Sequence, residues 1–145
     1  MRIERGAQFS MAWAGRPPGM SSGDFAIWQR WRPFHVDDYT EVYYDASLIP
    51  EIKYPLGVDD SMYMMWDQNI AKRIDVLAYA PTHVDIIEIR VSAGFSALAA
   101  VEAYESLYRL ATNTKLPTRK IIITDSPDAM IIPFAAAKNI DIQIA

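Results

Sequence analysis

The chain lacks cysteine altogether and has only two histidines, His35 and His83. The first absence excludes disulfide scaffolds, thiolate zinc sites and cysteine nucleophiles, and two separated histidines leave no imidazole metal cluster. The sequence also has no glycine-rich loop of the kind that holds phosphates in nucleotide-hydrolysing enzymes. Any chemistry must therefore rest on carboxylates, amines or hydroxyls.

Long apolar runs are missing as well. No run reaches 18 residues, and the N-terminal segment MRIERGAQF lacks the charged-then-apolar order of a signal peptide. We expect a protein that neither spans a membrane nor is secreted by a signal peptide, located in the cytoplasm or in a virion. The length of 145 residues and the 51% apolar composition suit one globular domain and exclude a two-domain enzyme.

Charge is unevenly distributed along the chain. Residues 1–35 carry a net charge of +3, and residues 36–60 carry a net charge of −6. The first 35 residues also contain three of the four tryptophans among glycines and prolines, with neither a helical nor a strand period. The sequence predicts an extended arm over residues 1–35 and a single α/β domain over residues 36–145.

Such an arm has two interpretations, which the sequence leaves open. It wraps over its own domain, or it docks on neighbouring subunits, where tryptophan and arginine are favoured anchors. The candidate partner-binding residues are Trp13, Arg16, Trp28, Arg30 and Trp31. By analogy with the ordered arms of capsid and tail assemblies, the partners would be protein neighbours in a homo- or hetero-oligomeric assembly.

The rest of the chain shows clearer periodicity, because apolar residues recur at helical spacing or cluster in β-branched runs. From residue 60 onward the predicted order is α, β, β, α, β, α, β. The expected elements are strands at 39–45 and 49–54, a helix at 61–71 capped by Asp60 or Ser61, hairpin strands at 73–79 and 84–91, a helix capped by Ser96 that stops before Asn113, a strand at 119–124, a helix that starts at Ser126–Pro127–Asp128, kinks or restarts at Pro133 and is closed by Asn139, and a strand at 141–145.

Four charges fall on one side of the predicted hairpin. If Tyr79 pairs with Val84, then Asp75 faces Glu88, and Arg73 faces Arg90. Two facing carboxylates need a cation between them. Mg²⁺, which takes oxygen ligands, is one source, and a four-membered ion network of Arg73, Asp75, Glu88 and Arg90 is the other. The opposite side of the hairpin carries Ile74, Val76, Ile87 and Ile89 as an apolar stripe.

At these residues the chain resembles the PD-(D/E)XK nuclease superfamily. That superfamily places an aspartate on one strand and Glu-x-Lys on the next, followed by a helix, a strand and further α/β structure. Here Arg73-Ile74-Asp75 is followed after twelve residues by Glu88-Ile89-Arg90, and then by the segments AVEAYESLYRL, RKIIITD, SPDAMIIPFAAAKNI and DIQIA. The resemblance covers residues 60–145 and implies a restriction-endonuclease-like fold, with a mixed sheet flanked by helices.

The resemblance implies that Asp75 and Glu88 would ligate Mg²⁺ and that Arg90 stands where the family has its catalytic lysine. A guanidinium stays protonated, so Arg90 cannot act as a base. Relatives also carry Gln-x-x-x-Tyr on the next helix, of which Tyr104 is kept while Ala100 replaces the glutamine. Both departures fall on the catalytic groups, as expected where a nuclease fold has lost its reaction and Asp75, Glu88 and Arg90 are vestigial.

The sequence therefore favours a non-catalytic nuclease-fold subunit without a cofactor, working in the assembly of a phage-type virion (head, neck or tail) and docking through its N-terminal arm. The alternative is a Mg²⁺-dependent DNA endonuclease or exonuclease of the PD-(D/E)XK type. The acidic balance of the body disfavours tight duplex binding, because phosphate contacts require clustered lysine and arginine.

Overall fold

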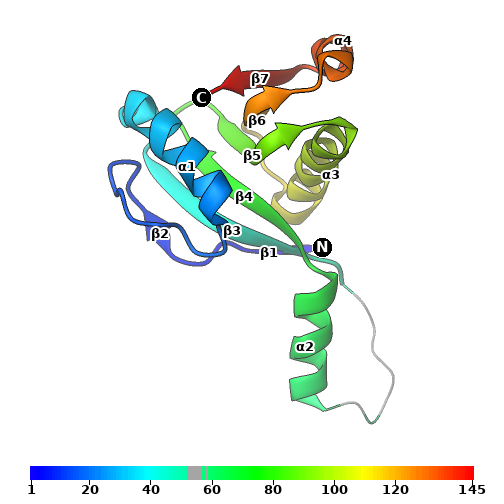
Figure 1. Cartoon of the computed structure of the whole chain (residues 1–145). Helices are drawn as coiled ribbons and strands as arrows, with labels where there is room; N and C mark the ends of the chain where they lie inside the picture. The colour runs from blue at the N-terminus through cyan, green and yellow to red at the C-terminus, as the bar shows by residue number, and fades with distance from the viewer. Residues whose placement is uncertain (52–56, 58) are drawn as a thin grey trace.

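The computed structural model describes residues 1–51, 57 and 59–145. Within these residues the centre of the molecule is a seven-stranded mixed sheet (Figure 1). The spatial order is β1-β3-β4-β5-β6-β7, with β2 also paired to β3. Strand β3 is antiparallel to β1, β2 and β4, and β4 is antiparallel to β5. The pairs β5–β6 and β6–β7 are parallel. The strands are β1 (Arg2–Glu4), β2 (Gln8–Phe9), β3 (Glu41–Ile49), β4 (Lys72–Tyr79), β5 (Val84–Ala93), β6 (Thr118–Pro127) and β7 (Ile140–Ile144). This confirms the predicted α/β class with a mixed sheet flanked by helices.

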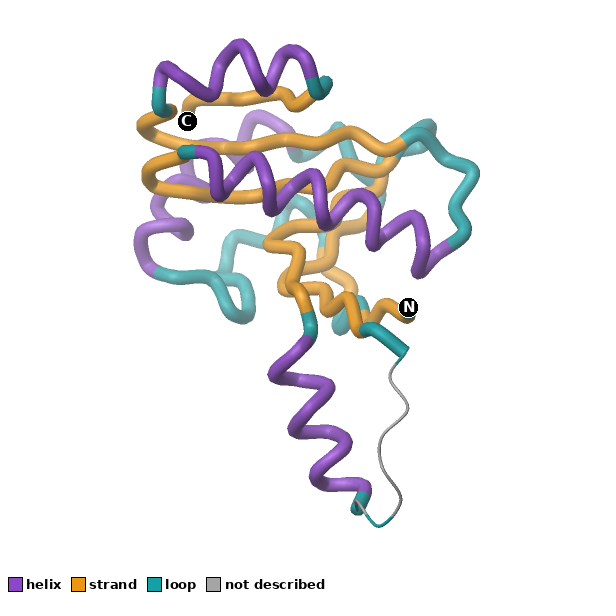
Figure 2. Tube along the Cα trace, turned by 90° about the vertical axis from the view of Figure 1, so that its right-hand side faces the viewer, coloured by secondary structure: helices purple, strands orange, loops and turns teal. Residues whose placement is uncertain are grey.

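Helices cover both faces of the sheet. Helix α1 (Ser22–Trp31) lies on one face, α3 (Phe95–Thr112) lies on the other, and the short α4 (Ile132–Ala137) lies beside β7 (Figures 1 and 2). Two 3₁₀ turns, η1 (Arg32–His35) and η2 (Ala129–Ile131), follow α1 and precede α4. Helix α2 (Asp60–Ile70) projects away from the sheet.

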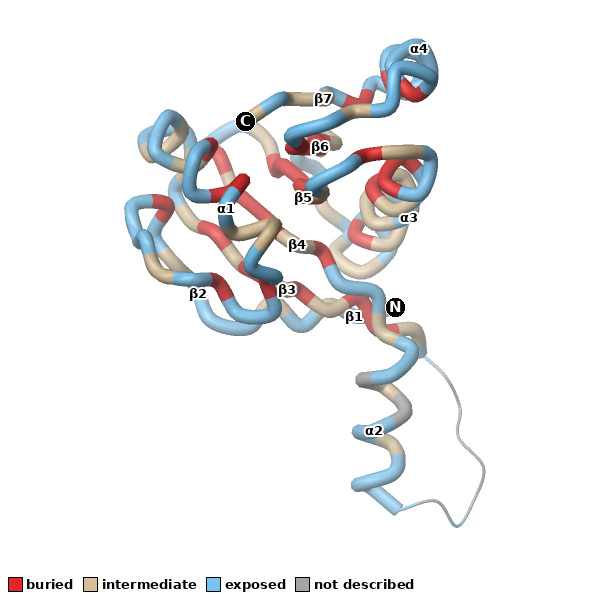
Figure 3. The backbone as a smooth tube through the Cα atoms, in the orientation of Figure 1, coloured by how far each residue is buried: buried red, intermediate tan, exposed pale blue. Residues whose placement is uncertain are grey.

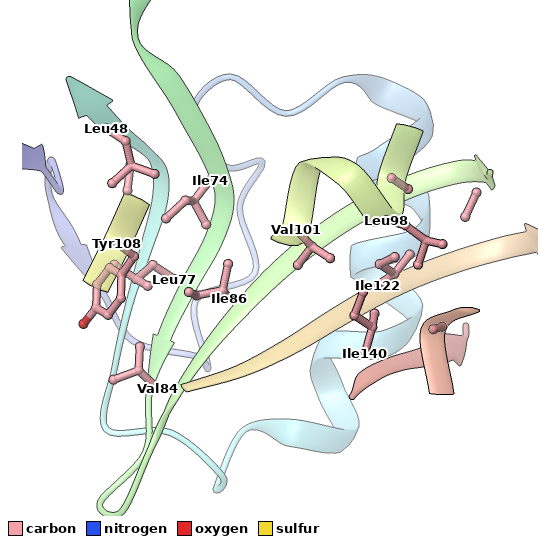
Figure 4. Packing of buried hydrophobic residues seen from close by; sticks show 14 of the residues in the cluster. Leu48, Ile74, Leu77, Val84, Ile86, Leu98, Val101, Tyr108, Ile122 and Ile140 are labelled. Carbon is pink, nitrogen blue, oxygen red and sulfur yellow. The ribbon is translucent and has the colours of Figure 1, made fainter. Parts of the chain in front are cut away.

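Burial follows this layering, with the central strands the most buried part of the trace (Figure 3). The core on the α3 side packs Val101 and Tyr108 of α3 against apolar residues of the central strands, including Leu77, Ile86 and Ile122 (Figure 4). The core on the α1 side gathers Ile27, Trp28 and Trp31 with Val76, Ala78, Ile87, Ile89, Ile121 and Ile123. The continuous run Ile121–Ile123 contributes to both cores, as expected for a strand covered on both faces.

The prediction of an extended arm over residues 1–35 is wrong. That segment forms β1, β2, α1 and η1, and the exposed fractions of Trp28 and Trp31 are only 1% and 5%. The Ser21 side chain caps α1 by accepting a hydrogen bond from the backbone N–H of Asp24. Ile27, Trp28 and Trp31 then share one face of a ten-residue helix, a signal too short to stand out among the surrounding glycines and prolines. The first residues of the chain are therefore part of its own core.

The elements from α2 to β7 confirm the predicted order, with differences at the helix starts. Asp59 caps α2 in place of Asp60 or Ser61, and α3 begins after Gly94, before Ser96. Ser126 and Pro127 belong to β6, because the Asp128 N–H donates to the Ala93 carbonyl at 2.8 Å beside the last β5–β6 pair. Asp128 instead caps η2, and the predicted restart of the helix is found as α4, which begins at Ile132 with Pro133 in its first turn.

Strands β3 and β4 both change face at one facing pair of aspartates. Tyr44 and Val76 point into the α1-side core, whereas Ala46 and Ile74, two residues further along each strand, point into the α3-side core. Asp45, which has a positive φ of 55°, lies on β3 between these positions, and Asp75 lies opposite on β4. Ile74 is therefore not on the same side as Val76, contrary to the strict alternation that we predicted. The predicted strand at 49–54 is also not found as such: Ile49 ends β3, and residues 52–54 lie outside the described residues.

The connection between β3 and β4 carries α2. The methionines of this helix are exposed, at 39% (Met62), 63% (Met64) and 52% (Met65). Much of the helix lies in solvent (Figure 3). An ion pair of 2.7 Å between Arg2 of β1 and Asp67 links the helix to the sheet. No helix in the described part of the chain is long and apolar enough to cross a membrane.

Candidate functional site

The candidate site lies where the central strands β4 and β5 separate. Their paired positions run from Tyr79–Val84 to Val76–Ile87, as predicted from the hairpin turn. Beyond that point the backbone N–H of Ile89 donates to Asp75 Oδ2 at 2.8 Å, so a carboxylate takes the place of a ladder carbonyl. This hydrogen bond fixes the Asp75 carboxylate between the two strands.

Glu88 lies on β5 next to this gap and has an exposed fraction of 3%. Its Oε1 atom lies 2.7 Å from Nε of Arg90, whose side chain is 41% exposed. The Nε–H is not directed at the oxygen, so the contact is an ion pair without a hydrogen bond. Glu88 Oε2 is buried and has no hydrogen-bond partner among the described residues. When both carboxyl groups are ionised, this oxygen is therefore left unsatisfied, whereas a proton held by the pair lets Glu88 and Asp75 share a hydrogen bond.

Burial raises the pKa of both carboxyl groups of this pair. Burial, followed by the charge of Asp75, raises the pKa of Glu88 from 4.5 to about 8. Burial also raises the pKa of Asp75, against the lowering effect of the Ile89 N–H. Because each charge disfavours the other, the pair holds about one proton near neutral pH in the absence of a further cation.

The predicted four-membered ion network is not formed. Arg73 pairs with Ser47 of β3 in the ladder, and its guanidinium binds Asp45 at 2.7 Å. The reason is the change of face at Asp75, which carries the residues before it out of the predicted alignment with β5. Arg90 is thus the one arginine of the predicted network that contacts Glu88. The cation that the facing carboxylates require is only partly supplied.

Two further residues approach the site from the helices. The charge of Asp24, in the first turn of α1, contributes to the raised pKa of Asp75. Burial, followed by the charges of Glu88 and Asp75, raises the pKa of Tyr104 on α3, the tyrosine kept from the family pattern. Sequence reasoning missed Asp24, because it lies in the segment interpreted as an arm and nothing local connects it to residue 75.

A small cavity of about 10 Å³ adjoins Asp75, with room for one water molecule or ion. It is lined by Asp45, Asp75 and the backbone turn Pro18–Met20. Gly19 has a φ of +74°, and a Cβ at this position would lie 2.8 Å from Asp45 Cγ. Glycine therefore lets this turn cover the aspartates closely.

The residues predicted to bind partners are placed mostly within the fold. Trp28 and Trp31 are buried, and Trp31 Nε1 donates to Gln143 of β7 at 2.7 Å. Arg16 donates to the Met20 carbonyl at 3.0 Å, and Arg30 forms an ion pair with Asp125 of β6. Trp13, at 37% exposed, still contacts Phe9, with ring centroids 4.5 Å apart. As a set they hold α1 and the preceding loop to the sheet.

Comparisons with known proteins add evidence on the fold alone. No family model matches the chain, and no curated protein matches it. The structure is similar to the crystal structure of protein VC1899 from Vibrio cholerae, with a TM-score of 0.55 and 12% sequence identity. The match covers 84% of this chain and 30% of VC1899, so this chain spans about a third of that protein's length.

Proposed function

We propose that this chain is a divalent-metal-dependent nuclease domain with its site at Asp75, Glu88 and Arg90. The observation that carries the proposal is the buried pair of Glu88 and Asp75, in which Glu88 Oε2 has no donor when both carboxyl groups are ionised. Arg73, the other arginine expected to neutralise this pair, is bound to Asp45 instead. An acid pair with an open oxygen and incomplete compensation is what a cation-binding site requires.

The residues present fit a hard divalent cation. Mg²⁺ takes oxygen ligands and usually needs one or two carboxylates plus water, which Asp75 and Glu88 can supply. When bound, such an ion polarises a phosphate and lowers the pKa of a bound water. The neighbouring cavity lined by Asp45 and Asp75 is of the size that one ion or water occupies.

The remaining residues have supporting tasks. The Ile89 N–H holds Asp75 in place, so that its carboxylate does not have to be ordered when a ligand arrives. Arg90, half exposed and permanently charged, is suited to stabilise negative charge on a phosphodiester, but not to remove a proton. The raised pKa of Tyr104 keeps its phenol protonated and able to donate a hydrogen bond.

The second candidate is the non-catalytic assembly subunit, in a phage-type virion. Two observations favour it: Arg90 stands in the lysine position and pairs with Glu88, and several large apolar side chains are exposed near the ends of β5 and β6. Phe95 and Phe134 are 51% and 54% exposed and lie edge to face, with centroids 5.4 Å apart. Such a cluster suits contact with another protein. The burial of Trp28 and Trp31 removes the main support for docking through an arm, and this candidate therefore ranks second.

Calorimetry with MnCl₂ and MgCl₂ tests the proposed metal site. The wild-type chain is expected to bind Mn²⁺, and Asp75→Asn and Glu88→Gln are expected to abolish binding. Asp125→Asn, which removes a surface carboxylate of β6, is the matched control and should bind as wild type does. Absence of binding at millimolar metal in the wild type would overturn the proposal.

Cleavage of plasmid and single-stranded DNA is the second measurement. Metal-dependent cleavage that Asp75→Asn abolishes supports the nuclease. If the wild type binds metal but does not cleave DNA, the nuclease proposal is overturned and the second candidate is favoured. Cleavage by Arg90→Lys in that case would show that the site keeps its metal and has lost only the proton-accepting group.

A further inference from the structure

The last strand of the sheet, β7, has an open edge. It pairs with β6 and, among the described residues, with no other strand (Figure 1). Its sequence, IDIQI, contains no proline or lysine, and its register with β6 runs without a bulge. Proteins usually protect an exposed edge strand with such devices, because its free N–H and C=O groups template pairing with another strand. β7 carries one charged side chain, Asp141, and neither proline nor a bulge, so its backbone edge is competent to pair.

The direction of the free backbone groups follows from one hydrogen bond. The Ala145 N–H donates to the Thr124 carbonyl of β6 at 3.2 Å. Backbone groups alternate sides along a strand, so the N–H and C=O groups of Ile140, Ile142 and Ile144 point away from β6. Three evenly spaced residues therefore present donors and acceptors to the open side.

An apolar groove accompanies this edge. It lies between α4 and β7, has a volume of about 190 Å³, and is lined by Ile132, Ala135, Ala136, Ile140 and Ile142. Beside it, Ile132 is 46% exposed and Ile144 is 67% exposed. A strand added to β7 would place every second side chain over this groove.

We propose that β7 pairs antiparallel with β7 of a second copy of this chain, joining two sheets into one. A two-fold axis at Ile142 places Ile140 opposite Ile144 of the second copy and Asp141 opposite Gln143 of the second copy. In this register all the outward backbone groups are paired, and no like charges face each other. A shift of the axis to residue 141 would place two aspartates opposite each other.

The side chains on the α1 side of the strand suit the same register. Gln143 Nε2 donates to Asp141 of its own chain at 2.7 Å, and an amide nitrogen has a second hydrogen to give. That hydrogen is available for Asp141 of the second copy. On the face of the sheet that carries α4, the apolar grooves of the two copies would meet at the two-fold axis, and Ile132 and Ile144 would be covered by the second copy. This inference goes beyond the proposed function and does not depend on metal binding.

Sedimentation equilibrium at micromolar concentrations tests the proposal. The wild-type chain is expected to have twice the mass of one chain, and Ile144→Lys is expected to have the mass of one. Leu110→Lys is the matched control, since Leu110 is 70% exposed on α3, away from β7, and it should leave the dimer intact. A monomeric wild type, which leaves the edge to a different protein, overturns the proposal, and so does a dimer that persists in Ile144→Lys.

A second variant and a second readout cover the case in which Ile144→Lys misfolds. Ile144→Pro removes one outward N–H and no bond to β6, so it should keep the circular dichroism spectrum of the wild type and lose the dimer. Hydrogen exchange should show the amides of Ile140, Ile142 and Ile144 slowed at high protein concentration. Exchange of these amides that does not change with concentration contradicts pairing through β7.

Discussion

Asp85 and Glu88 are two buried acids three residues apart on β5, and they differ in how many partners their carboxylate oxygens have. Asp85 is fully buried and accepts two hydrogen bonds from Arg119, at 2.7 and 2.6 Å, together with one from Tyr39. Glu88 has a single ion pair and an unpartnered oxygen. A buried carboxylate that only supports the fold is satisfied by its own chain. The contrast is what the proposed metal site would require of Glu88, since a ligand would then supply the missing partner.

The largest expected effect comes from removing the partner of Asp85. Arg119→Met leaves a charge buried without compensation and should lower the free energy of unfolding by about 3–5 kcal/mol, towards the lower end because half of the Arg119 side chain is in solvent. Urea denaturation measures this loss. The double variant Arg119→Met/Asp85→Asn should recover part of it, and a loss below about 1 kcal/mol would mean that the two acids are not treated differently.

Replacing Glu88 should have the opposite effect, a gain in stability that depends on pH. Its pKa is raised in the folded state, from 4.5 to about 8, so the folded protein holds a proton that the unfolded chain releases in that range. Stability from this group is therefore full below pH 4.5 and falls as pH rises to about 8. Glu88→Gln has no such group to titrate, so between pH 5 and 8 its free energy of unfolding should exceed that of the wild type by up to about 2–4 kcal/mol.

Urea denaturation of both proteins across this pH range, without metal, gives the measurement. Glu4→Gln, which changes an exposed carboxylate of β1, is the control and should run parallel to the wild type. Parallel curves for Glu88→Gln as well would show that Glu88 is already compensated in the metal-free protein.

A smaller effect is expected at Tyr39, whose hydroxyl donates to Asp85. Tyr39→Phe removes one hydrogen bond to a buried charge and should cost about 1.5–3 kcal/mol, since the two Arg119 bonds remain. Thermal unfolding by circular dichroism measures it. A cost as large as that of Arg119→Met would show that the tyrosine, and not the arginine, is the main partner of Asp85.

The smallest effect is expected at Arg73, the arginine that the sequence assigned to the Glu88 site. Its ion pair with Asp45 is partly exposed, and Arg73→Ala should change stability by about 1 kcal/mol or less. It should also leave the pH dependence at Glu88 unchanged. A shifted pH profile would place Arg73 in electrostatic contact with Glu88 after all.

The hairpin and the acid pair could be predicted because their determinants are local. The turn at Ala80–His83 sets the register of β4 on β5, and that register brings residues 75 and 88 together. Contacts between distant segments could not be predicted in this way. Asp45, which has a positive φ, lies against the turn at Gly19, and two strands change face at its position. Helix α1 was missed because only three residues define its buried face. It is stabilised by packing against β5 and β6, which are distant in the sequence.

The excursion that carries α2 leaves the sheet and returns to the same place. Leu48 at the end of β3 is already paired with Lys72 at the start of β4, so the two strand ends are neighbours before residues 50–71 are counted. A connection of a few residues would close the same ladder, and each doubling of a flexible loop costs only about 0.6 kcal/mol. This is the position at which the chain can gain, lose or exchange a segment while the sheet, both cores and the acid pair keep their geometry.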